Sequence, residues 1–185
     1  MASIRKNRIA VTLLELAIVL LVIGLMAAVA APRFGQAMRG VQSRAVAIQI
    51  AAHLNYVRRT AINQGQTTTL TFAATGSGYT STDVTFPDRV EEKLRVNLRE
   101  MFDPSVSAIA DFDSATQIDA STITFDPEGV PHVGTSAMHG GMITVSSPGA
   151  PSQYLVIAAG TGTVTIYSAA EMQSASVSQS GGGGS

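Results

Sequence analysis

The spacing of hydrophobic residues divides the chain into three parts. Residues 16–31 form a run of 16 residues without a polar side chain. Beyond this run, hydrophobic residues recur at intervals of four, four, three and four, which is the spacing of one buried helical stripe. The stripe consists of Val46, Ile50, Leu54, Val57 and Ala61. From residue 67 onward, hydrophobic and polar residues alternate, and this pattern predicts strands.

The helical spacing predicts one long helix over residues 11–63. From residue 9 to residue 31 the only charged side chain is Glu15. With about 1.5 Å of rise per residue, a helix over residues 11–32 covers the roughly 30 Å hydrocarbon core of a bilayer. We therefore expect the first half of the helix to be transmembrane. Pro32 lacks a backbone donor and is expected to kink the helix, and Gly65 is expected to cap its end.

Residues 64–169 are predicted to form a β-rich domain. Strands are expected at residues 67–73, 78–82, 121–125, 142–146, 154–158 and 163–167, and short links favour antiparallel pairing. The run Asp126-Pro127-Glu128-Gly129 suits a type I turn. Residues 88–114 hold most of the charge and are expected to be irregular, with one short strand or helix at residues 93–98. Residues 170–185 are rich in Ser, Gln and Gly and are expected to be disordered, and the final GGGGS has the composition of a flexible linker.

Composition and charge separate the two halves of the chain. Of 185 residues, 45% are apolar and 14% are charged, so one domain with an appendage is expected. Residues 1–63 carry eight Lys and Arg against one acid, whereas residues 64–185 carry four against twelve. The basic start, with Arg5, Lys6 and Arg8, places the N-terminus in the cytoplasm by the positive-inside rule. The absence of Cys excludes disulfides, zinc-thiolate sites and thiol nucleophiles.

Glu15 is the residue of the apolar helix that calls for a function. A carboxylate at the centre of a bilayer costs about 2.5–3.5 kcal/mol, and such residues are usually functional. Cleavage between Ala10 and Val11 would create an amine four residues before Glu15, on the same helical face. This amine could pair with Glu15 or with the Glu of a neighbouring subunit. The alternative is that Glu15 only reaches the cytoplasmic headgroups.

Residues 5–34 resemble the type III signal and N-terminal helix of type IV pilins and type II secretion pseudopilins. The resemblance rests on the basic leader, the small Ala10, Val11, the Thr12-Leu13-Leu14-Glu15 sequence and the apolar run after it. Family members usually have Gly and Phe where this chain has Ala10 and Val11. Gly24 and Pro32 stand where pilin-like helices commonly have a flexible or kinked turn.

Three later segments resemble the minor pseudopilin H and FimT-like group within this family. They are residues 54–65 (LNYVRRTAINQG), residues 123–129 (ITFDPEG) and the pair 154–157 (YLVI) and 160–166 (GTGTVTI). The resemblance leaves residues 83–120 uncovered.

The resemblance implies an α+β, pilin-like fold, with a long N-terminal helix packed on an antiparallel sheet. It implies that a prepilin peptidase removes leader residues 1–10, that Val11 is N-methylated and that Glu15 acts in assembly. The expected function is structural and without catalysis: a single-pass inner-membrane minor pseudopilin of a type II secretion pseudopilus. Its C-terminal domain would be periplasmic and its partners other pseudopilins or pilins. The alternative within the family is a FimT-like minor pilin of a type IV pilus or competence system.

An ordinary secretory signal is the main rival interpretation. Ala28-Val29-Ala30 forms a cleavage site after an apolar core. Cutting near Ala30 would release a soluble secreted β-domain. Glu15 inside the apolar run, the length of that run and the helical pattern beyond the site all count against this interpretation.

Candidate chemistry elsewhere in the chain is sparse. Asp126, Glu128, His132 and His139 form a conceivable metal set, against the alternative of a polar hairpin, and we expect no metal, cofactor or catalytic residue. His53 lies beside the buried helical stripe and is expected to be structural. After residue 63, four basic residues face twelve acids, so the clustered positive charge that nucleic acids require is missing.

Overall fold

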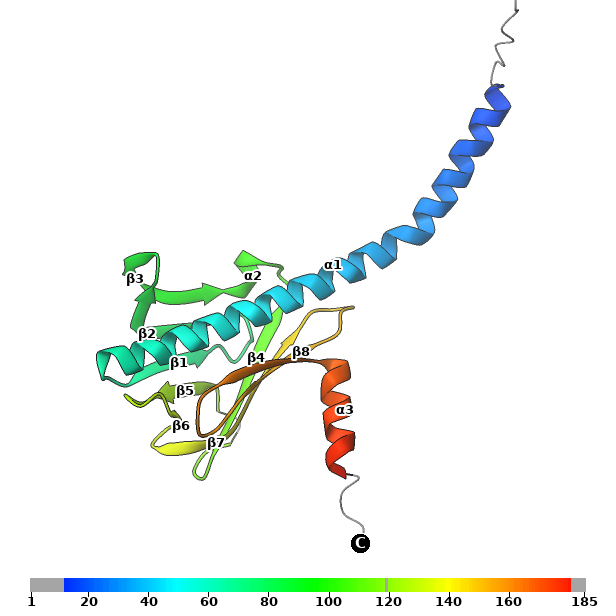
Figure 1. Cartoon of the computed structure of the whole chain (residues 1–185). Coiled ribbons are helices and arrows are strands. Elements are labelled where there is room, and N and C mark those ends of the chain that lie inside the picture. The colour runs from blue at the N-terminus through cyan, green and yellow to red at the C-terminus, as the bar shows by residue number, and fades with distance from the viewer. Residues whose placement is uncertain (1–11, 119, 181–185) are drawn as a thin grey trace, which may run out of the picture. The chain divides into compact units, whose positions relative to one another are not determined.

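The computed structural model describes residues 12–118 and 120–180, and the side chains at 29–34, 37, 90 and 175–180 lie outside this description. The chain forms two compact units, Met1–Ala37 and Met38–Ser185. Helix α1 (Leu13–Gln64) contributes to both (Figure 1). The predicted helix over residues 11–63 is close to these bounds.

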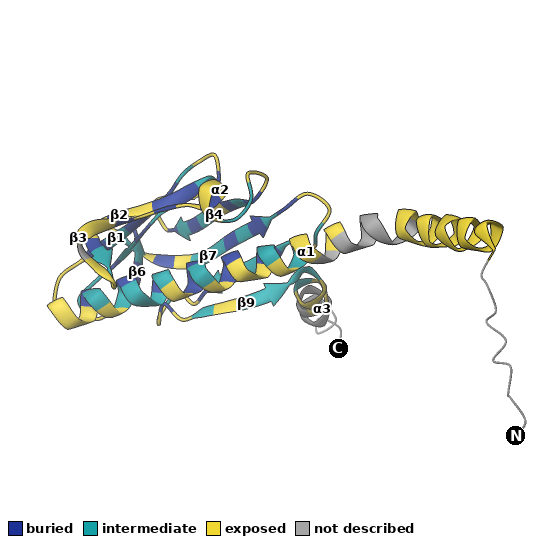
Figure 2. Ribbon diagram, turned by 90° about the horizontal axis from the view of Figure 1, so that it is seen from above, coloured by how far each residue is buried: buried dark blue, intermediate teal, exposed yellow. Residues whose placement is uncertain are grey.

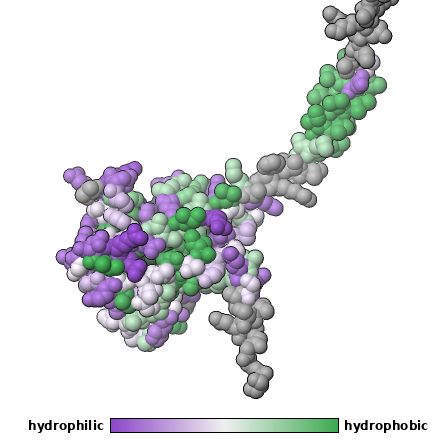
Figure 3. All heavy atoms as spheres, viewed as in Figure 1, coloured by the Kyte–Doolittle hydropathy of each residue, from purple (hydrophilic) through white to green (hydrophobic). Residues whose placement is uncertain are grey.

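In the first unit, α1 begins with a side-chain cap. The backbone N–H of Glu15 donates to Thr12 Oγ1 at 3.2 Å, and the N–H of Leu16 donates to the Thr12 carbonyl at 3.1 Å. Thr12 thus satisfies a backbone donor that the first turn leaves without a helical partner. The large apolar side chains from Leu13 to Met26 are between 47% and 86% exposed. This part of α1 is almost wholly apolar in Figure 3, apart from a hydrophilic patch near its start.

Within the described residues, no helix combines the length and the apolar character needed to cross a membrane.

The second unit contains an antiparallel sheet. Its described strands are β1 (Thr68–Phe72), β2 (Gly78–Phe86), β3 (Arg89–Asn97), β4 (Ser107–Ser114), β5 (Thr122–Phe125), β6 (Pro131–Val133), β7 (Ser136–Ser146), β8 (Gln153–Ile157) and β9 (Val164–Ser168). They follow the order β3-β2-β1-β5-β6-β7-β8-β9, and β4 pairs with β7 outside this path. All described pairings are antiparallel. The predicted α+β class, with a long helix packed on an antiparallel sheet, is confirmed.

The core lies between α1 and the sheet. Each residue of the predicted stripe is 0% exposed: Val46, Ile50, Leu54, Val57 and Ala61. They share one hydrophobic cluster with inward residues of the strands, among them Phe72, Ile123 and Phe125. Figure 2 shows buried and exposed residues alternating along this part of α1, as expected for a helix with one face on a sheet.

The end of α1 follows the sequence-based expectation. Gly65 has φ of 61°, and the N–H of Gln66 donates to the Ala61 carbonyl at 3.2 Å. A left-handed glycine followed by this bond is the Schellman ending of a helix. The chain thereby reverses and enters β1 three residues later.

The expectation of irregular structure over residues 88–114 is wrong, except for the short strand or helix expected at residues 93–98, where β3 ends and a helix begins. This segment forms β3, the short helix α2 (Leu98–Met101) and β4. In β3 the charged residues face solvent, while Leu94 and Val96 are buried on the opposite face. In β4 the inward residues are Ala108, Ala110 and Phe112. Alternation was present in both strands, but the charges masked it in β3 and small residues weakened it in β4.

The expectation of disorder is also wrong for residues 170–180, because α3 spans Ala169–Ser180. The N–H and hydroxyl of Ser168 donate to Glu171 Oε2 at 2.6 and 2.7 Å, and the Glu171 N–H donates back to Ser168 Oγ at 3.4 Å. This reciprocal pair is a capping box, which starts a helix. The backbone and side-chain hydrogen bonds from Ser168, with the charge of Arg44, hold the pKa of Glu171 below its ordinary value.

Two predicted strands are longer than expected, and one further strand was not predicted. The strand expected at residues 78–82 extends to Phe86 in β2. The strand expected at residues 142–146 begins earlier, since β7 spans Ser136–Ser146 and includes Gly140 and Gly141. The three-residue β6 had no sequence counterpart among the predicted strands. Leader residues 1–10 and the terminal GGGGS lie outside the described residues.

Substitution by alanine should have different effects on the two faces of α1. Leu54→Ala should lower the free energy of unfolding by about 2–5 kcal/mol, because it opens a cavity in the core. Ile48→Ala, on the opposite face where Ile48 is 53% exposed, should change it by no more than about 0.5 kcal/mol. Urea unfolding of the full chain in detergent, followed by circular dichroism, measures both. Equal losses in the two variants would contradict this assignment of faces.

Candidate functional site

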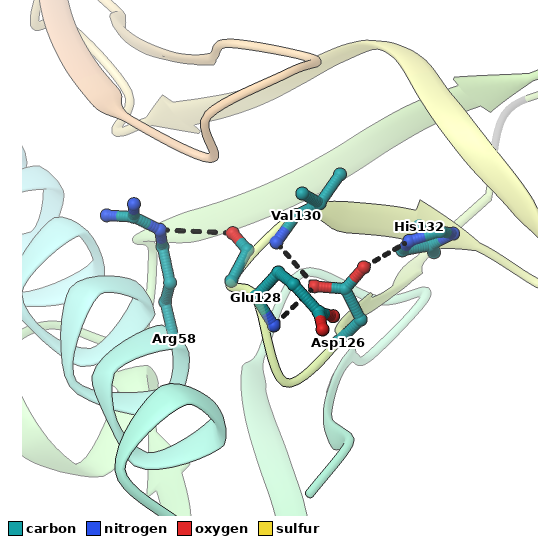
Figure 4. A network of polar contacts seen from close by, with 6 residues as sticks. Arg58, Asp126, Glu128, Val130 and His132 are labelled. Atoms are coloured by element: carbon teal, nitrogen blue, oxygen red, sulfur yellow. Dashed lines mark hydrogen bonds and ion pairs between the residues drawn. The ribbon is translucent and has the colours of Figure 1, made fainter. Parts of the chain in front are cut away.

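A polar junction joins the end of α1 to the turn between β5 and β6. The Nε–H of Arg58 donates to the carbonyl of Gly129 at 3.1 Å (Figure 4). Nearby, the buried hydroxyl of Thr68 at the start of β1 donates to the Val57 carbonyl at 3.1 Å. The first bond joins α1 to a turn 71 residues away in sequence, and the second joins it to the strand that follows directly. They fix the C-terminal part of the helix on the sheet.

Asp126 organises the turn that Arg58 contacts. Its Oδ1 accepts hydrogen bonds from the N–H groups of Glu128 at 3.1 Å and Val130 at 2.7 Å, and its Oδ2 lies 2.9 Å from Nε2 of His132. Burial alone would raise the pKa of Asp126. The bonds from Val130, His132 and Glu128 and the charge of His132 outweigh this effect, so the pKa lies below its ordinary value.

Two glycines allow the turns to approach Arg58 closely. Gly129 has φ of 81° and Gly162, in the β8–β9 turn, has φ of 64°. A Cβ at Gly129 would lie 2.6 Å from Cδ1 of Ile62, and one at Gly162 would lie 3.1 Å from Cδ of Arg58. Arg58 therefore contacts two turns that are separate in sequence. The predicted turn at residues 126–129 is present, with the Gly129 N–H donating to the Asp126 carbonyl at 2.9 Å.

The structure brings only part of the conceivable metal set together. Asp126 and His132 form a pair, whereas Glu128 enters the network through its backbone and His139 is exposed. Among the described residues, no group of three or more His, Asp or Glu side chains is placed to hold a metal ion. The carboxylate of Asp126 instead serves the polar hairpin that was the alternative interpretation.

His53 occupies a half-buried position under the β2–β3 hairpin. Its Nδ1 lies 2.6 Å from the hydroxyl of Tyr79, and its ring meets Phe86 edge-on at 6.3 Å between centroids. Burial lowers the pKa of His53 and raises the pKa of Tyr79. Both groups are therefore neutral near pH 7, which fits the structural role predicted for His53. A hollow of about 500 Å³ lies beside His53, lined by residues of α1, of the β2–β3 hairpin and by Met101.

The predicted N-terminal site residues are described only in part. Ala10 and Val11 lie outside the described residues. Glu15 is exposed in the first turn of α1, where its negative charge interacts favourably with the helix dipole. The helix is continuous through Gly24 and Pro32, and the kink expected there stays a prediction.

A second stripe on α1 was missed from the sequence. Met38, Val41 and Ile48 are 64%, 66% and 53% exposed, and Ala45 is exposed between them. Their spacing of three, four and three places them on one helical face, opposite the buried stripe. Both stripes have helical spacing in the sequence, and the two overlap between residues 45 and 50. Only the buried stripe was predicted.

Acid titration tests the role of Asp126. Its pKa in the fold lies below the ordinary 3.8, so the stability it contributes is complete above about pH 4 and is lost as the pH falls through the lowered pKa. Asp126→Asn should therefore lower the Tm at neutral pH, and its difference from the wild type should shrink in acid.

Thermal unfolding of both full-length proteins between about pH 6 and about pH 2 measures this difference. Asp88→Asn is the control, because Asp88 is 74% exposed in the β2–β3 turn and should change the Tm little. If the Tm difference between the wild type and Asp126→Asn stays constant in acid, the charge of Asp126 does not stabilise the fold.

Comparison with known proteins places this architecture in a family. The family model of the type II transport protein GspH matches residues 46–162, which is more than half of the chain. The matched segment begins at the first residue of the buried stripe and ends at Gly162 in the β8–β9 turn. No curated protein sequence matches the chain significantly.

Two crystal structures of the type IV minor pilin FimU from Pseudomonas aeruginosa PAO1, in space groups P21 and P65, are similar to this chain. Sequence identity is 13% and 15%, and each match covers 68% of this chain. The matches cover 86% and 90% of the FimU chains, with TM-scores of 0.43 and 0.42.

The family match includes the C-terminal part of α1, the network around Arg58 and Asp126, and the sheet through β8. The pilin-like fold expected from the sequence is confirmed by this match together with the helix-on-sheet architecture. The chain belongs to the family of the type II transport protein GspH.

Proposed function

We propose that this protein is a minor pseudopilin, a structural subunit that assembles with other pseudopilins into the pseudopilus of a type II secretion system. The family match supports a role of this kind. The role requires no catalytic step. A FimT-like minor pilin of a type IV pilus is the second candidate, because the sequence segments that resemble the pseudopilin H group resemble the FimT-like group equally.

The observation that carries the proposal is the exposed apolar surface at the start of α1. Its large side chains from Leu13 to Met26 are at least 47% exposed, and so extensive an apolar surface is unfavourable in water. Lipid and the apolar helices of partner subunits are the two environments that would cover it. We infer that residues 11–32 anchor the protein in the inner membrane. The basic leader would lie in the cytoplasm and the sheet domain on the periplasmic side.

The exposed stripe of Met38, Val41, Ala45 and Ile48 supports the same role. In the globular unit this surface lies on the side of α1 away from the sheet. Neighbouring apolar helices would bury it in a filament. We therefore assign this stripe to contacts between subunits. We assign to Glu15 the role of pairing with the terminal amine of a neighbouring subunit, which would set the axial register.

Processing of the N-terminus separates the proposal from the secretory rival. We expect a prepilin peptidase to cut between Ala10 and Val11 and the new amine of Val11 to be methylated. Co-expression with a prepilin peptidase, N-terminal sequencing and mass spectrometry of the product test both steps. A mature terminus at Ala31 would instead identify a secreted protein with an ordinary signal. An uncut chain would contradict both interpretations.

Glu15→Leu tests the assembly role. The variant makes the helix more apolar, so membrane insertion should be kept or improved, while cross-linking to partner pseudopilins should fall because the terminal amine loses its carboxylate. The backbone N–H of residue 15 still donates to Thr12, so loss of the charge removes at most about 1 kcal/mol of dipole interaction.

Thr12→Val is the matched control, because it removes the capping oxygen and keeps Glu15. If both variants lose cross-linking equally, the effect belongs to the helix start and the assembly role of Glu15 is wrong. Wild-type cross-linking and secretion in Glu15→Leu would also contradict that role, and would support a carboxylate that only reaches the headgroups.

A further inference from the structure

The described free edges of the sheet differ in how they are protected. β3 carries Arg89, Glu91, Glu92, Lys93 and Arg95, and its register with β2 shifts between Thr80 and Thr85. Charged side chains and bulges are the usual means of preventing a further strand from pairing with an edge. β3 is therefore a protected edge.

The free side of β4 is occupied by backbone from other parts of the chain. The Ala108 N–H donates to the Gly76 carbonyl at 2.9 Å, and Phe112 and Ala120 exchange hydrogen bonds at 3.0 and 3.1 Å. The Ser114 N–H donates to the Gln117 carbonyl at 2.7 Å. Backbone groups of Ala108, Phe112 and Ser114 on this side are therefore already bonded within the chain.

β9 has neither kind of protection. Its sequence is Val-Thr-Ile-Tyr-Ser, and within the described part of the chain it pairs with β8 alone. The chain has no Asp, Glu, Lys or Arg between Glu128 and Glu171. The last strands thus form an uncharged end of the sheet, rich in β-branched residues.

The hydrogen-bond pattern shows which backbone groups of β9 are free. Antiparallel partners alternate between pairs that exchange hydrogen bonds and pairs that do not. The Ala158 N–H donates to the Thr163 carbonyl at 2.9 Å, and in the same register Val156 faces Thr165 and Tyr154 faces Tyr167. Thr165 and Tyr167 therefore bond to β8. The N–H and C=O groups of Val164 and Ile166 point away from it.

We propose that the free edge of β9 binds an extended, uncharged segment of another protein, which adds to the sheet as a further strand over residues 164–166. Backbone groups in strand geometry select an extended chain, as in other cases of strand addition. The side chains of Val164 and Ile166 are half-buried against the core. Apolar residues of the added strand would complete their burial, and residues between them would pack beside Thr165 and Tyr167.

A second copy of this chain is a poorer occupant than a different partner. Two-fold pairing centred on Ile166 would set Val164 opposite Ser168 and would need the Ser168 N–H of both copies. That N–H already donates to Glu171 Oε2 at 2.6 Å and begins α3. Pairing of two copies in this register would break both capping boxes. A second copy is then left with one two-fold register, centred on Thr165, whereas a strand from another protein can pair over residues 164–166 without this restriction.

Binding of a defined peptide tests the inference on the full chain in detergent. The probe is a labelled peptide with the β8 sequence Gln-Tyr-Leu-Val-Ile, which is uncharged and already forms a strand beside β9. We expect it to bind in a fluorescence anisotropy titration and to slow the hydrogen exchange of the Val164 and Ile166 amides. A peptide of the same length with two Lys residues should not bind.

Three variants locate the binding. Val164→Pro removes a donor that points away from β8, at the first residue of an edge strand where proline is tolerated. Thr165→Lys adds a charge to the edge at an exposed side chain. Each should weaken peptide binding by about tenfold or more. Thr80→Lys, the same change at an exposed threonine of β2, should leave binding unchanged.

Absence of binding to the wild type, or equal binding by all variants, would overturn the proposal. A concentration-dependent dimer that Val164→Pro abolishes would also overturn it, by assigning the edge to a second copy. If Val164→Pro does not fold, the comparison of Thr165→Lys with Thr80→Lys still decides. The result does not depend on the pseudopilin role, because peptide binding and Glu15-dependent assembly are measured separately.

Discussion

Burial of one face of α1 is the constraint on which the globular unit depends. Val46, Ile50, Leu54 and Val57 are fully buried, and the inward residues of strands throughout the sheet belong to the same cluster. The sheet has one face toward solvent and one toward α1. By covering the inner face, the helix excludes water from it. The family match begins at Val46, where this burial begins.

The junction at Arg58 shows how a helix end is held in register with loops far away in sequence. The side chain of Arg58 lies against the turn that follows β5 and the turn that follows β8, and each turn has a glycine where a Cβ would collide with its neighbours. Asp126 gives the first of these turns its shape through backbone N–H groups. These polar groups shape the turn: the Asp126 carboxylate bonds to backbone N–H groups and to the imidazole of His132.

The sequence predicted those features that depend on local periodicity. The buried stripe of α1, its glycine cap, the turn at residues 126–129 and the antiparallel strands all have short-range signals. It failed where a long-range partner decides the outcome. β3 looks irregular because its charges are visible in sequence, whereas the burial of Leu94 and Val96 depends on the pairing with β2. The α3 helix was missed although Ser168 and Glu171 have the spacing of a capping box, because composition was given more weight than that spacing. The Arg58 contacts join segments some seventy residues apart, and no local pattern announces such a contact.

The pairing of β1 has a kinetic consequence. β1 takes as neighbours both β2, which follows directly, and β5, which begins some fifty residues later. Pairings that close long loops lose chain entropy before they gain contacts, so domains rich in them fold slowly, in about milliseconds to seconds. During synthesis the helix and β1 emerge long before the strand that completes their core. Until β5 arrives, one edge of β1 has no partner, so the sheet and the core between it and α1 cannot be completed.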